Sequence, residues 1–121
     1  MTRCLVIDVS KIIRKLATRM LGVLNIETCE AENGAEGFDV CAKEQPDVVI
    51  VDWNMPVLDG LGFIKRLRAA TDLPQPKILM CTTETELSKI MDAMAAGADE
   101  YIMKPFDEEI LGSKLEILGV R

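Results

Sequence analysis

Two kinds of segment alternate along the chain. Short runs of apolar, often β-branched residues, which are typical of strands, are separated by longer stretches in which apolar residues recur every three or four positions, as they do on one face of a helix. The predicted strands cover residues 3–8, 26–31, 48–52, 77–82 and 100–104. The pattern therefore predicts five strands, each followed by a helix.

Capping and helix-breaking residues set the limits of the predicted helices. The first helix follows Ser10, whose hydroxyl suits an N-cap, and has an apolar face formed by Ile13, Leu16, Ala17, Met20 and Leu24. The second and third helices cover residues 35–44 and 62–70. The fourth covers residues 86–96, ends before Gly97, and is expected to bury Leu87, Ile90, Met91 and Met94. The fifth begins after Asp107 and uses Ile110, Leu111, Leu115 and Leu118.

The predicted strands are typical of a parallel sheet. The runs CLVI, VVIV and ILMC are apolar at successive positions, as expected for strands that helices cover on both faces. Right-handed crossovers leave few sheet orders, of which 2-1-3-4-5 is a common one, although periodicity alone does not select it. We expect an α/β protein with a five-stranded parallel sheet in this order and five flanking helices, which is a flavodoxin-like, doubly wound fold. Residues 1–121 are expected to form a single domain with no effector domain.

Composition excludes several classes of function. The formal net charge is −6, and no run of Lys and Arg is dense enough to follow a phosphate backbone, so nucleic-acid binding is not expected. The start MTRCLVID lacks the length of a signal peptide, and no apolar run approaches the about 20 residues of a membrane span. We therefore expect a cytoplasmic protein that does not bind membranes.

The four cysteines, at widely separated positions, form no metal-binding or redox motif. The chain has no histidine, and three of the cysteines lie in predicted strands, where a free thiol behaves as a small apolar side chain. We expect all four to be reduced and structural.

Candidate chemistry lies at the ends of the predicted strands. Apolar strands end in, or just before, a polar side chain at four places: Asp8, Asp52, Thr82 and Lys104. In an open parallel sheet, functional groups gather at the carboxyl ends of the strands, and strands one and three are neighbours in the expected order. We therefore expect these four side chains to converge on one edge of the sheet.

Two carboxylates at that edge favour a divalent cation between them, because like charges raise the cost of ionising both. Mg²⁺ is suitable, since it binds through one or two carboxylates and completes its coordination with water and phosphate oxygens. A carboxylate can also attack phosphorus, and Asp52 is the best-placed nucleophile. Lys104 and Thr82 would then contact the added phosphoryl oxygens.

Three segments together resemble the receiver family of two-component signalling, and especially the chemotaxis-type stand-alone receivers. They are DWNMPVLDG at residues 52–60, MCTT at residues 80–83 and YIMKPF at residues 101–106. Each segment is weak evidence by itself, but their order and spacing along the whole chain make the joint signal strong.

The resemblance implies a role for each matching position. Asp52 would be the phosphoacceptor, Lys104 the phosphate-binding lysine and Thr82 the hydroxyl that follows the phosphoryl group. Asp8 and the backbone carbonyl of Asn54 would bind Mg²⁺ together with Asp52. The resemblance also implies that Tyr101 is a switch residue that moves with Thr82, and that Pro105 follows a cis peptide bond.

The chain departs from the family pattern at Val9. Family members usually have two adjacent acids after the first strand, the second of which binds the metal directly, whereas this chain has Asp8-Val9. A valine side chain cannot bind Mg²⁺, so metal affinity should fall by at least the about 10–100-fold that loss of an outer-shell partner costs. Either Asp8 coordinates Mg²⁺ directly, or the metal-free state lasts longer than in family members with two adjacent acids.

The resemblance also implies partners. A sensor histidine kinase or a histidine phosphotransfer protein would supply the phosphoryl group. Output would pass by protein contact through the face of the fourth helix, fifth strand and fifth helix, which contains Leu87, Ile90, Tyr101 and Phe106. We expect a monomer rather than a dimer, and a protein that is modified rather than an enzyme.

Three other interpretations were compared with this one. A degenerate receiver that acts only by binding is the most serious, because Val9 weakens the metal site. A phosphatase with an aspartate nucleophile needs a second acid two residues later, where this chain has Asn54. A flavin carrier needs a phosphate-binding loop rich in Gly, Ser and Thr after the first strand, which residues 8–12 do not provide.

Overall fold

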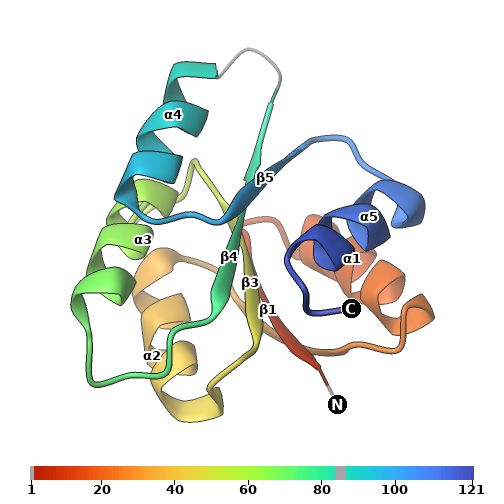
Figure 1. Ribbon diagram of the computed structural model, residues 1–121, viewed down its shortest axis with the longest axis horizontal. Coiled ribbons are helices and arrows are strands. Elements are labelled where there is room, and N and C mark those ends of the chain that lie inside the picture. The colour runs from red at the N-terminus through yellow and green to blue at the C-terminus, as the bar shows by residue number, and fades with distance from the viewer. Residues whose placement is uncertain (1, 84–86) are drawn as a thin grey trace.

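Five parallel strands form one sheet in the centre of the molecule (Figure 1). The computed structural model describes residues 2–83 and 87–121. The strand order is β2-β1-β3-β4-β5, so the predicted fold class and sheet order are confirmed. The strands are β1 (Arg3–Ile7), β2 (Glu27–Ala31), β3 (Val48–Asp52), β4 (Lys77–Thr82) and β5 (Glu100–Met103).

Helices cover both faces of the sheet. Figure 1 shows α1 and α5 on one side and α2, α3 and α4 on the other. Their bounds are α1 (Lys11–Val23), α2 (Gly34–Glu44), α3 (Gly60–Ala69), α4 (Leu87–Ala96) and α5 (Glu108–Ile117). The described helices and strands therefore form a three-layer α/β structure, as the alternating sequence pattern predicts.

Short polar side chains cap the helices at their N-termini. The Ser10 hydroxyl accepts a hydrogen bond from the backbone N–H of Ile13, and the Asp107 carboxylate accepts one from Ile110, so both predicted caps are confirmed. Asp59 caps α3 in the same way, which starts that helix at Gly60, two residues earlier than the sequence pattern predicts.

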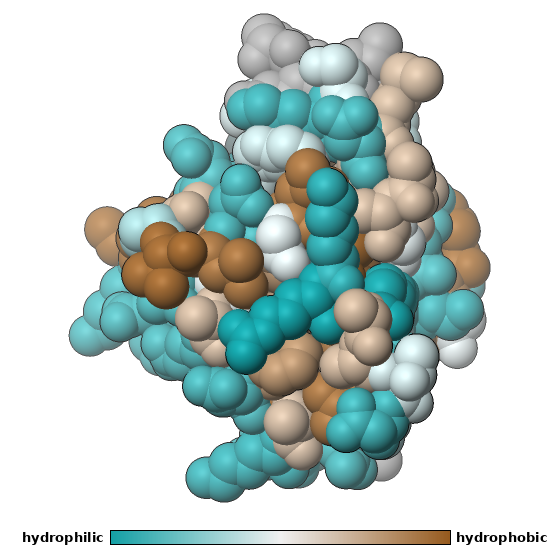
Figure 2. All heavy atoms as spheres, turned by 90° about the vertical axis from the view of Figure 1, so that its left-hand side faces the viewer, coloured by the Kyte–Doolittle hydropathy of each residue, from teal (hydrophilic) through white to brown (hydrophobic). Residues whose placement is uncertain are grey.

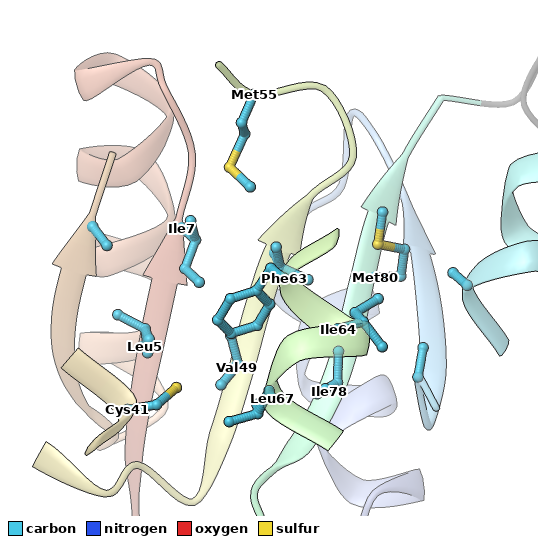
Figure 3. Packing of buried hydrophobic residues seen from close by; sticks show 14 residues of the cluster. Leu5, Ile7, Cys41, Val49, Met55, Phe63, Ile64, Leu67, Ile78 and Met80 are labelled. Atoms are coloured by element: carbon cyan, nitrogen blue, oxygen red, sulfur yellow. The ribbon is translucent and has the colours of Figure 1, made fainter. Parts of the chain in front are cut away.

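Each face of the sheet has its own apolar core. On the face toward α2, α3 and α4, Figure 3 shows Phe63 and Leu67 of α3 pointing toward Leu5 and Val49 of the sheet. On the other face the core includes Ala17, Leu21, Leu111 and Leu115 of α1 and α5, all buried. Burial on both faces explains why the central strands are apolar at successive positions.

The prediction for the buried face of α4 is wrong for two methionines. The side chains of Met91 and Met94 are 68% and 40% exposed, whereas Ile90 is buried and Ala93 is fully buried. Among the α4 side chains that the structure describes, only those of Ile90 and Ala93 are buried, so a narrow stripe of the helix is covered. Figure 2 looks onto the side of α2, α3 and α4, where hydrophilic residues predominate and apolar ones lie in separate groups. The predicted start at Glu86 and the burial of Leu87 lie outside the residues and side chains that the structure describes.

The apolar face of α1 is only partly buried. Ala17 and Leu21 pack into the core, whereas Ile13 and Leu16 are 36% and 45% exposed.

All four cysteines are free thiols, as expected. Burial raises the pKa of the Cys81 and Cys41 thiols to about 12, which is consistent with structural rather than reactive cysteines. In the described part of the chain, no helix is long and apolar enough to cross a membrane.

Candidate functional site

Two acidic residues lie side by side where the central strands end. β1 pairs with β3 in a register that places Ile7 opposite Val51. The next residues along the two strands are Asp8 and Asp52, which therefore lie next to each other at the same edge of the sheet. Val6 and Ile50, two positions earlier on each strand, belong to the core under α1 and α5. Because side chains alternate along a strand, both carboxylates leave the sheet on that face.

Lys104 joins the two carboxylates. Its ammonium Nζ lies 2.8 Å from Oδ1 of Asp52 and 3.1 Å from Oδ2 of Asp8. The Asp8 and Asp52 side chains are only 7% and 13% exposed. Lys104 directly follows β5, and its backbone N–H donates to the carbonyl oxygen of Thr82. The Lys104–Pro105 peptide bond is cis, which confirms that expectation. The structure thus brings together three of the four predicted strand-end side chains.

Burial and charge determine the electrostatics of this triad. Burial raises the pKa of Asp52 above its ordinary value, partly offset by the hydrogen bond and charge of Lys104. For Lys104, burial lowers the pKa, but the hydrogen bond and charge of Asp52 outweigh this and leave it above its ordinary value. Lys104 is therefore cationic at neutral pH, and its single charge partly compensates the two carboxylates.

Thr82 and Tyr101 lie close to the triad but do not join it. Thr82 is buried at the end of β4, and its hydroxyl donates a long hydrogen bond of 3.5 Å to the carbonyl oxygen of Thr83. Tyr101 is half-buried and pairs in register with Met80. The Lys114 ammonium lies over the Tyr101 ring, 4.6 Å from its centroid. Thr82 therefore lies on the strand next to that of Asp52, and Tyr101 lies on the edge strand beyond it.

Two residues of the expected output face lie on opposite faces of the sheet. Ile90 is buried, and Tyr101 packs against the core under α2, α3 and α4. Phe106 packs against the core on the opposite face of the sheet, where it lines a pocket with Met20 of α1. Including Phe106 with the α4 residues is therefore wrong, because the chain crosses to the α1 side as it leaves β5.

The acid pair has the oxygen ligands that Mg²⁺ prefers. Within residues 2–83 and 87–121, no group of three or more His, Cys, Asp and Glu side chains is placed to hold a metal ion. Asp8 and Asp52 remain, together with the exposed Asn54 in the loop after β3. Two carboxylates and a backbone carbonyl are hard oxygen donors, and Mg²⁺ binds through one or two carboxylates and keeps several waters, so the chemistry of this donor set fits Mg²⁺. Val9 adds nothing to it, since its side chain is 52% exposed and apolar.

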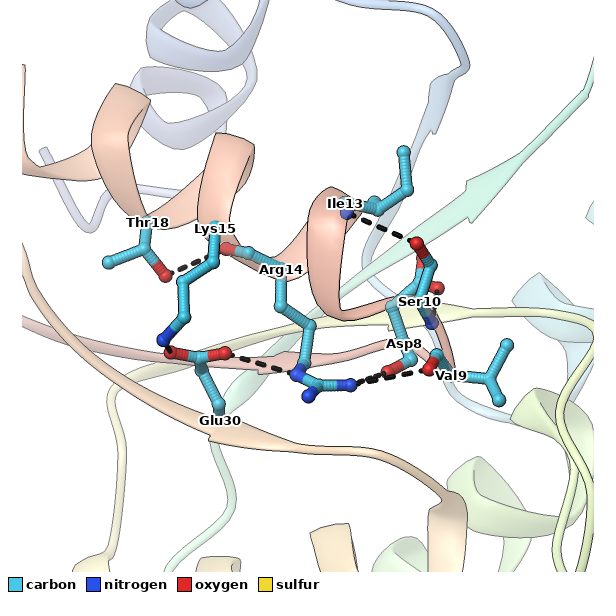
Figure 4. A network of polar contacts seen from close by, with 8 residues as sticks. All are labelled: Asp8, Val9, Ser10, Ile13, Arg14, Lys15, Thr18 and Glu30. Carbon is cyan, nitrogen blue, oxygen red and sulfur yellow. Dashed lines mark hydrogen bonds and ion pairs between the residues drawn. The ribbon is translucent and has the colours of Figure 1, made fainter.

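A further group of residues, which the sequence does not predict, lies beside this edge. Arg14 of α1 donates to the carbonyl oxygen of Asp8 at 2.7 Å and to Glu30 at 3.0 Å (Figure 4). The backbone N–H of Ser10 donates to Oδ1 of Asp8 at 2.9 Å. The only sequence signal for this group is a charged residue, Glu30, in the middle of a short edge strand.

Comparison with known proteins agrees with this geometry. The sequence model of one protein family, the response regulator receiver domain, matches residues 4–116 of this chain. The chain belongs to this family. The receiver is 38% identical over 120 residues to a chemotaxis protein CheY homolog of Campylobacter jejuni, covering 97% of this chain and 92% of the relative. It is 36% identical over 118 residues to chemotaxis protein CheY1 of Helicobacter pylori, covering 96% of this chain and 95% of that one.

Solved structures show the same fold. The receiver superposes on the chemotaxis response regulator CheY4 of Vibrio cholerae with a TM-score of 0.89 and 35% identity, covering 98% of both chains. A putative response regulator from Chloroflexus aurantiacus also gives a TM-score of 0.89, at 28% identity. The protein is therefore a receiver of two-component signalling, similar to chemotaxis-type stand-alone receivers.

Proposed function

We propose that this receiver accepts one phosphoryl group on the Asp52 carboxylate and signals through the resulting change in its surface. The observation that carries the proposal is the bridge from Lys104 to Asp52 and Asp8, at 2.8 and 3.1 Å. It holds a carboxylate next to a cation at the end of the central strand, where an incoming phosphoryl group can reach it. Family membership supports the same assignment.

In this reaction a carboxylate oxygen of Asp52 attacks phosphorus. The bond between phosphorus and the donor's leaving atom breaks, and the leaving group keeps that electron pair. Lys104 turns from the unmodified Asp52 carboxylate to the new phosphoryl oxygens. The phosphoryl group adds a charge of about −1.5 to −2 to the site. The Thr82 hydroxyl, whose hydrogen bond to the carbonyl oxygen of Thr83 is long at 3.5 Å, can donate to one of those oxygens.

Asp8, Asp52 and the backbone carbonyl of Asn54 are the residues that would hold Mg²⁺. When bound, the ion supplies positive charge that stabilises the developing charge on phosphorus and its oxygens. Asp8 also keeps Lys104 in position, because the ammonium contacts both acids. The missing acid at Val9 leaves the receiver with a weaker metal site than two adjacent acids would provide.

The proposed output is a shift between two states of the α4–β5–α5 side. Thr82 and Tyr101 lie on the two strands beyond Asp52, and Tyr101 is covered by Lys114 of α5, which also lies 3.4 Å from Glu100. A move of Thr82 toward the phosphoryl group frees space beside β5. A downstream protein that prefers one state would then read the change, since a partner shifts the balance only by its differential affinity.

We further propose that residues 1–121 act as one receiver domain, in the cytoplasm and as a monomer. A histidine kinase or a histidine phosphotransfer protein would serve as the donor. The relatives named CheY match over nearly their whole length, which supports signalling by protein contact.

The test is the intact mass of the protein after incubation with acetyl phosphate and Mg²⁺. The expected result is a gain of one phosphoryl group by the natural protein and none by Asp52→Asn. Asp59→Asn is the matched control, because Asp59 is an exposed helix cap that asparagine can replace. This variant should gain one group as well.

The same measurement distinguishes the proposed function from the alternative, which is a degenerate receiver that acts only by binding. Val9 is the observation that favours this alternative, since it removes a metal-binding side chain. If no phosphoryl group is taken up at any Mg²⁺ concentration, the proposed function is wrong and the binding-only alternative is supported.

A further inference from the structure

We infer that Arg14 is a positioning residue for Asp8, and that with Glu30 it sets the Mg²⁺ affinity of the acid pair. The inference rests on the proposed function in one respect, because it takes Asp8 as a metal-binding acid. It goes beyond that function by assigning a role to two residues that touch neither the phosphoacceptor nor any proposed ligand atom.

Arg14 binds the backbone of the turn that carries Asp8. Its Nη1 donates to the carbonyl oxygen of Asp8 at 2.7 Å and reaches the carbonyl oxygen of Val9 at 3.4 Å. Figure 4 shows the Arg14 side chain running down from α1 to these two carbonyls, with the Val9 side chain pointing away from it. One guanidinium group therefore holds two successive peptide groups of the β1–α1 turn.

Glu30 fixes the other side of the guanidinium. The Arg14 Nε donates to Oε1 of Glu30 at 3.0 Å, and the Lys15 ammonium contacts Oε2 at 2.8 Å. Hydrogen bonding by Lys15, and then by Arg14, lowers the pKa of Glu30, so this carboxylate is ionised at neutral pH. The Arg14 and Glu30 side chains are 13% and 25% exposed, which limits screening of the pair by solvent.

These contacts determine where the Asp8 carboxylate points. With the carbonyl oxygens of residues 8 and 9 held by Arg14, the next N–H, that of Ser10, is directed at Oδ1 of Asp8, 2.9 Å away. The remaining oxygen, Oδ2, then faces Lys104 at 3.1 Å and the space beside Asp52. Without this arrangement the Asp8 side chain could rotate away, which would leave Asp52 as the only carboxylate of the site.

The absence of an acid at position 9 makes this orientation more important. A site with two acids on the turn keeps one carboxylate in place when the other rotates, whereas this chain has only Asp8 there. Groups that orient a metal-binding side chain typically change metal affinity by about 10–100-fold when they are removed. Arg14 is such a group, although it acts through the backbone.

Arg14→Lys is the informative variant, because it keeps the positive charge but cannot bind Glu30 and the carbonyl oxygens at the same time. Arg68→Lys is the matched control. The Arg68 side chain is 22% exposed, binds the carbonyl oxygens of Gly97 and Pro76, and pairs with Asp99. It lies where β4 and β5 begin, at the edge of the sheet opposite to Asp52.

The measurement is calorimetric titration of Mg²⁺ into the unphosphorylated proteins, with the thermal midpoint of unfolding recorded for each. We expect Arg14→Lys to bind Mg²⁺ about tenfold more weakly. Arg68→Lys should lose thermal stability to a similar extent and keep its Mg²⁺ affinity within about twofold. Glu30→Gln should weaken binding less than Arg14→Lys, and the double variant should bind no more weakly than Arg14→Lys alone, because both changes break one arrangement.

Unchanged Mg²⁺ affinity in Arg14→Lys would overturn the inference, as would an equal loss in Arg68→Lys, which would indicate a general effect of stability. A natural protein that binds no Mg²⁺ would overturn it too, even if Asp52 is phosphorylated. Failure of the proposed function is a separate result, because it appears as missing phosphoryl uptake by a protein that still binds Mg²⁺.

Discussion

Gly60 packs against the backbone of Asp52 so closely that a Cβ atom at Gly60 would lie 2.5 Å from the carbonyl oxygen of Asp52. The same atom would lie 2.9 Å from Cα of Trp53. The Gly60 N–H also donates to the carbonyl oxygen of Trp53 at 2.9 Å, so the start of α3 and the end of β3 hold each other in place. A side chain at this position would have to move the strand end that carries the candidate phosphoacceptor.

We therefore predict that Gly60→Ala lowers the free energy of unfolding by about 1–3 kcal/mol, the usual cost of overpacking, and slows phosphorylation of Asp52. Urea denaturation and intact mass after incubation with acetyl phosphate measure the two effects. Gly22→Ala is the control, because no atom lies within 4 Å of a Cβ at that position in α1. It should raise stability by about 0.5–1 kcal/mol and leave phosphorylation unchanged. A Gly60→Ala protein as stable as the natural one would contradict the prediction.

Val57 has a backbone conformation that is unfavourable for a β-branched residue. Its φ angle is 69°, in the left-handed region, and its side chain is 82% exposed. The left-handed conformation costs an L-residue about 1–2 kcal/mol, and asparagine adopts it more readily than valine. We predict that Val57→Asn raises the free energy of unfolding by about 1 kcal/mol, measured by urea denaturation.

Val23→Asn is the control for this change, since Val23 is a 60% exposed valine in α1. It should be neutral or slightly destabilising. Equal effects at both positions would mean that removal of an exposed apolar side chain, rather than relief of backbone strain, explains any gain at Val57.

The fold could be predicted from the sequence because several local signals agree. Consecutive apolar runs indicated strands buried on both faces, and Ser10 and Asp107 marked helix starts that the structure confirms. Helical spacing did not show which part of α4 is covered, since Met91 and Ala93 are both apolar but only Ala93 touches the sheet. That choice depends on how close the helix lies, which is a tertiary property.

The sequence also predicted part of the candidate site. Asp8, Asp52 and Lys104 could be placed together because each follows a strand of a parallel sheet, and they do meet. The role of Arg14 could not be predicted, because its contacts with the turn are to backbone oxygens, which any residue type could supply, and because its contact with Glu30 joins residues far apart in the sequence. Phe106 was assigned to the wrong face because the direction of the loop after β5 is not encoded in periodicity.

Asp52→Asn is predicted to stabilise the metal-free protein at neutral pH. Burial raises the pKa of Asp52 in the folded state, so the folded state binds this proton more readily than the unfolded state does. The contribution of Asp52 to stability therefore falls as pH rises from its ordinary pKa through the folded value. Replacing the carboxylate with a neutral amide removes that cost, and we expect a gain on the order of 1 kcal/mol at pH 7.

Urea denaturation in the presence of a chelator measures this gain as a function of pH. The difference between Asp52→Asn and the natural protein should shrink as the pH is lowered through the raised pKa of Asp52, because Asp52 itself then becomes protonated. If Asp52→Asn is instead the less stable protein at pH 7, the ion pair with Lys104 outweighs the burial of the carboxylate.

Val9→Asp is predicted to lower the Mg²⁺ concentration that half-saturates phosphorylation, by about tenfold or more, because it adds a carboxylate beside Asp8. Val9 is 52% exposed, so the change should cost little folding stability. Phosphorylation by acetyl phosphate, followed by intact mass across a Mg²⁺ titration, measures the effect. Val9→Asn is the control of similar shape, and since it adds no charge it should gain much less. If the natural protein and Val9→Asp half-saturate at the same Mg²⁺ concentration, Asp8 already coordinates the ion well enough that the second acid adds nothing.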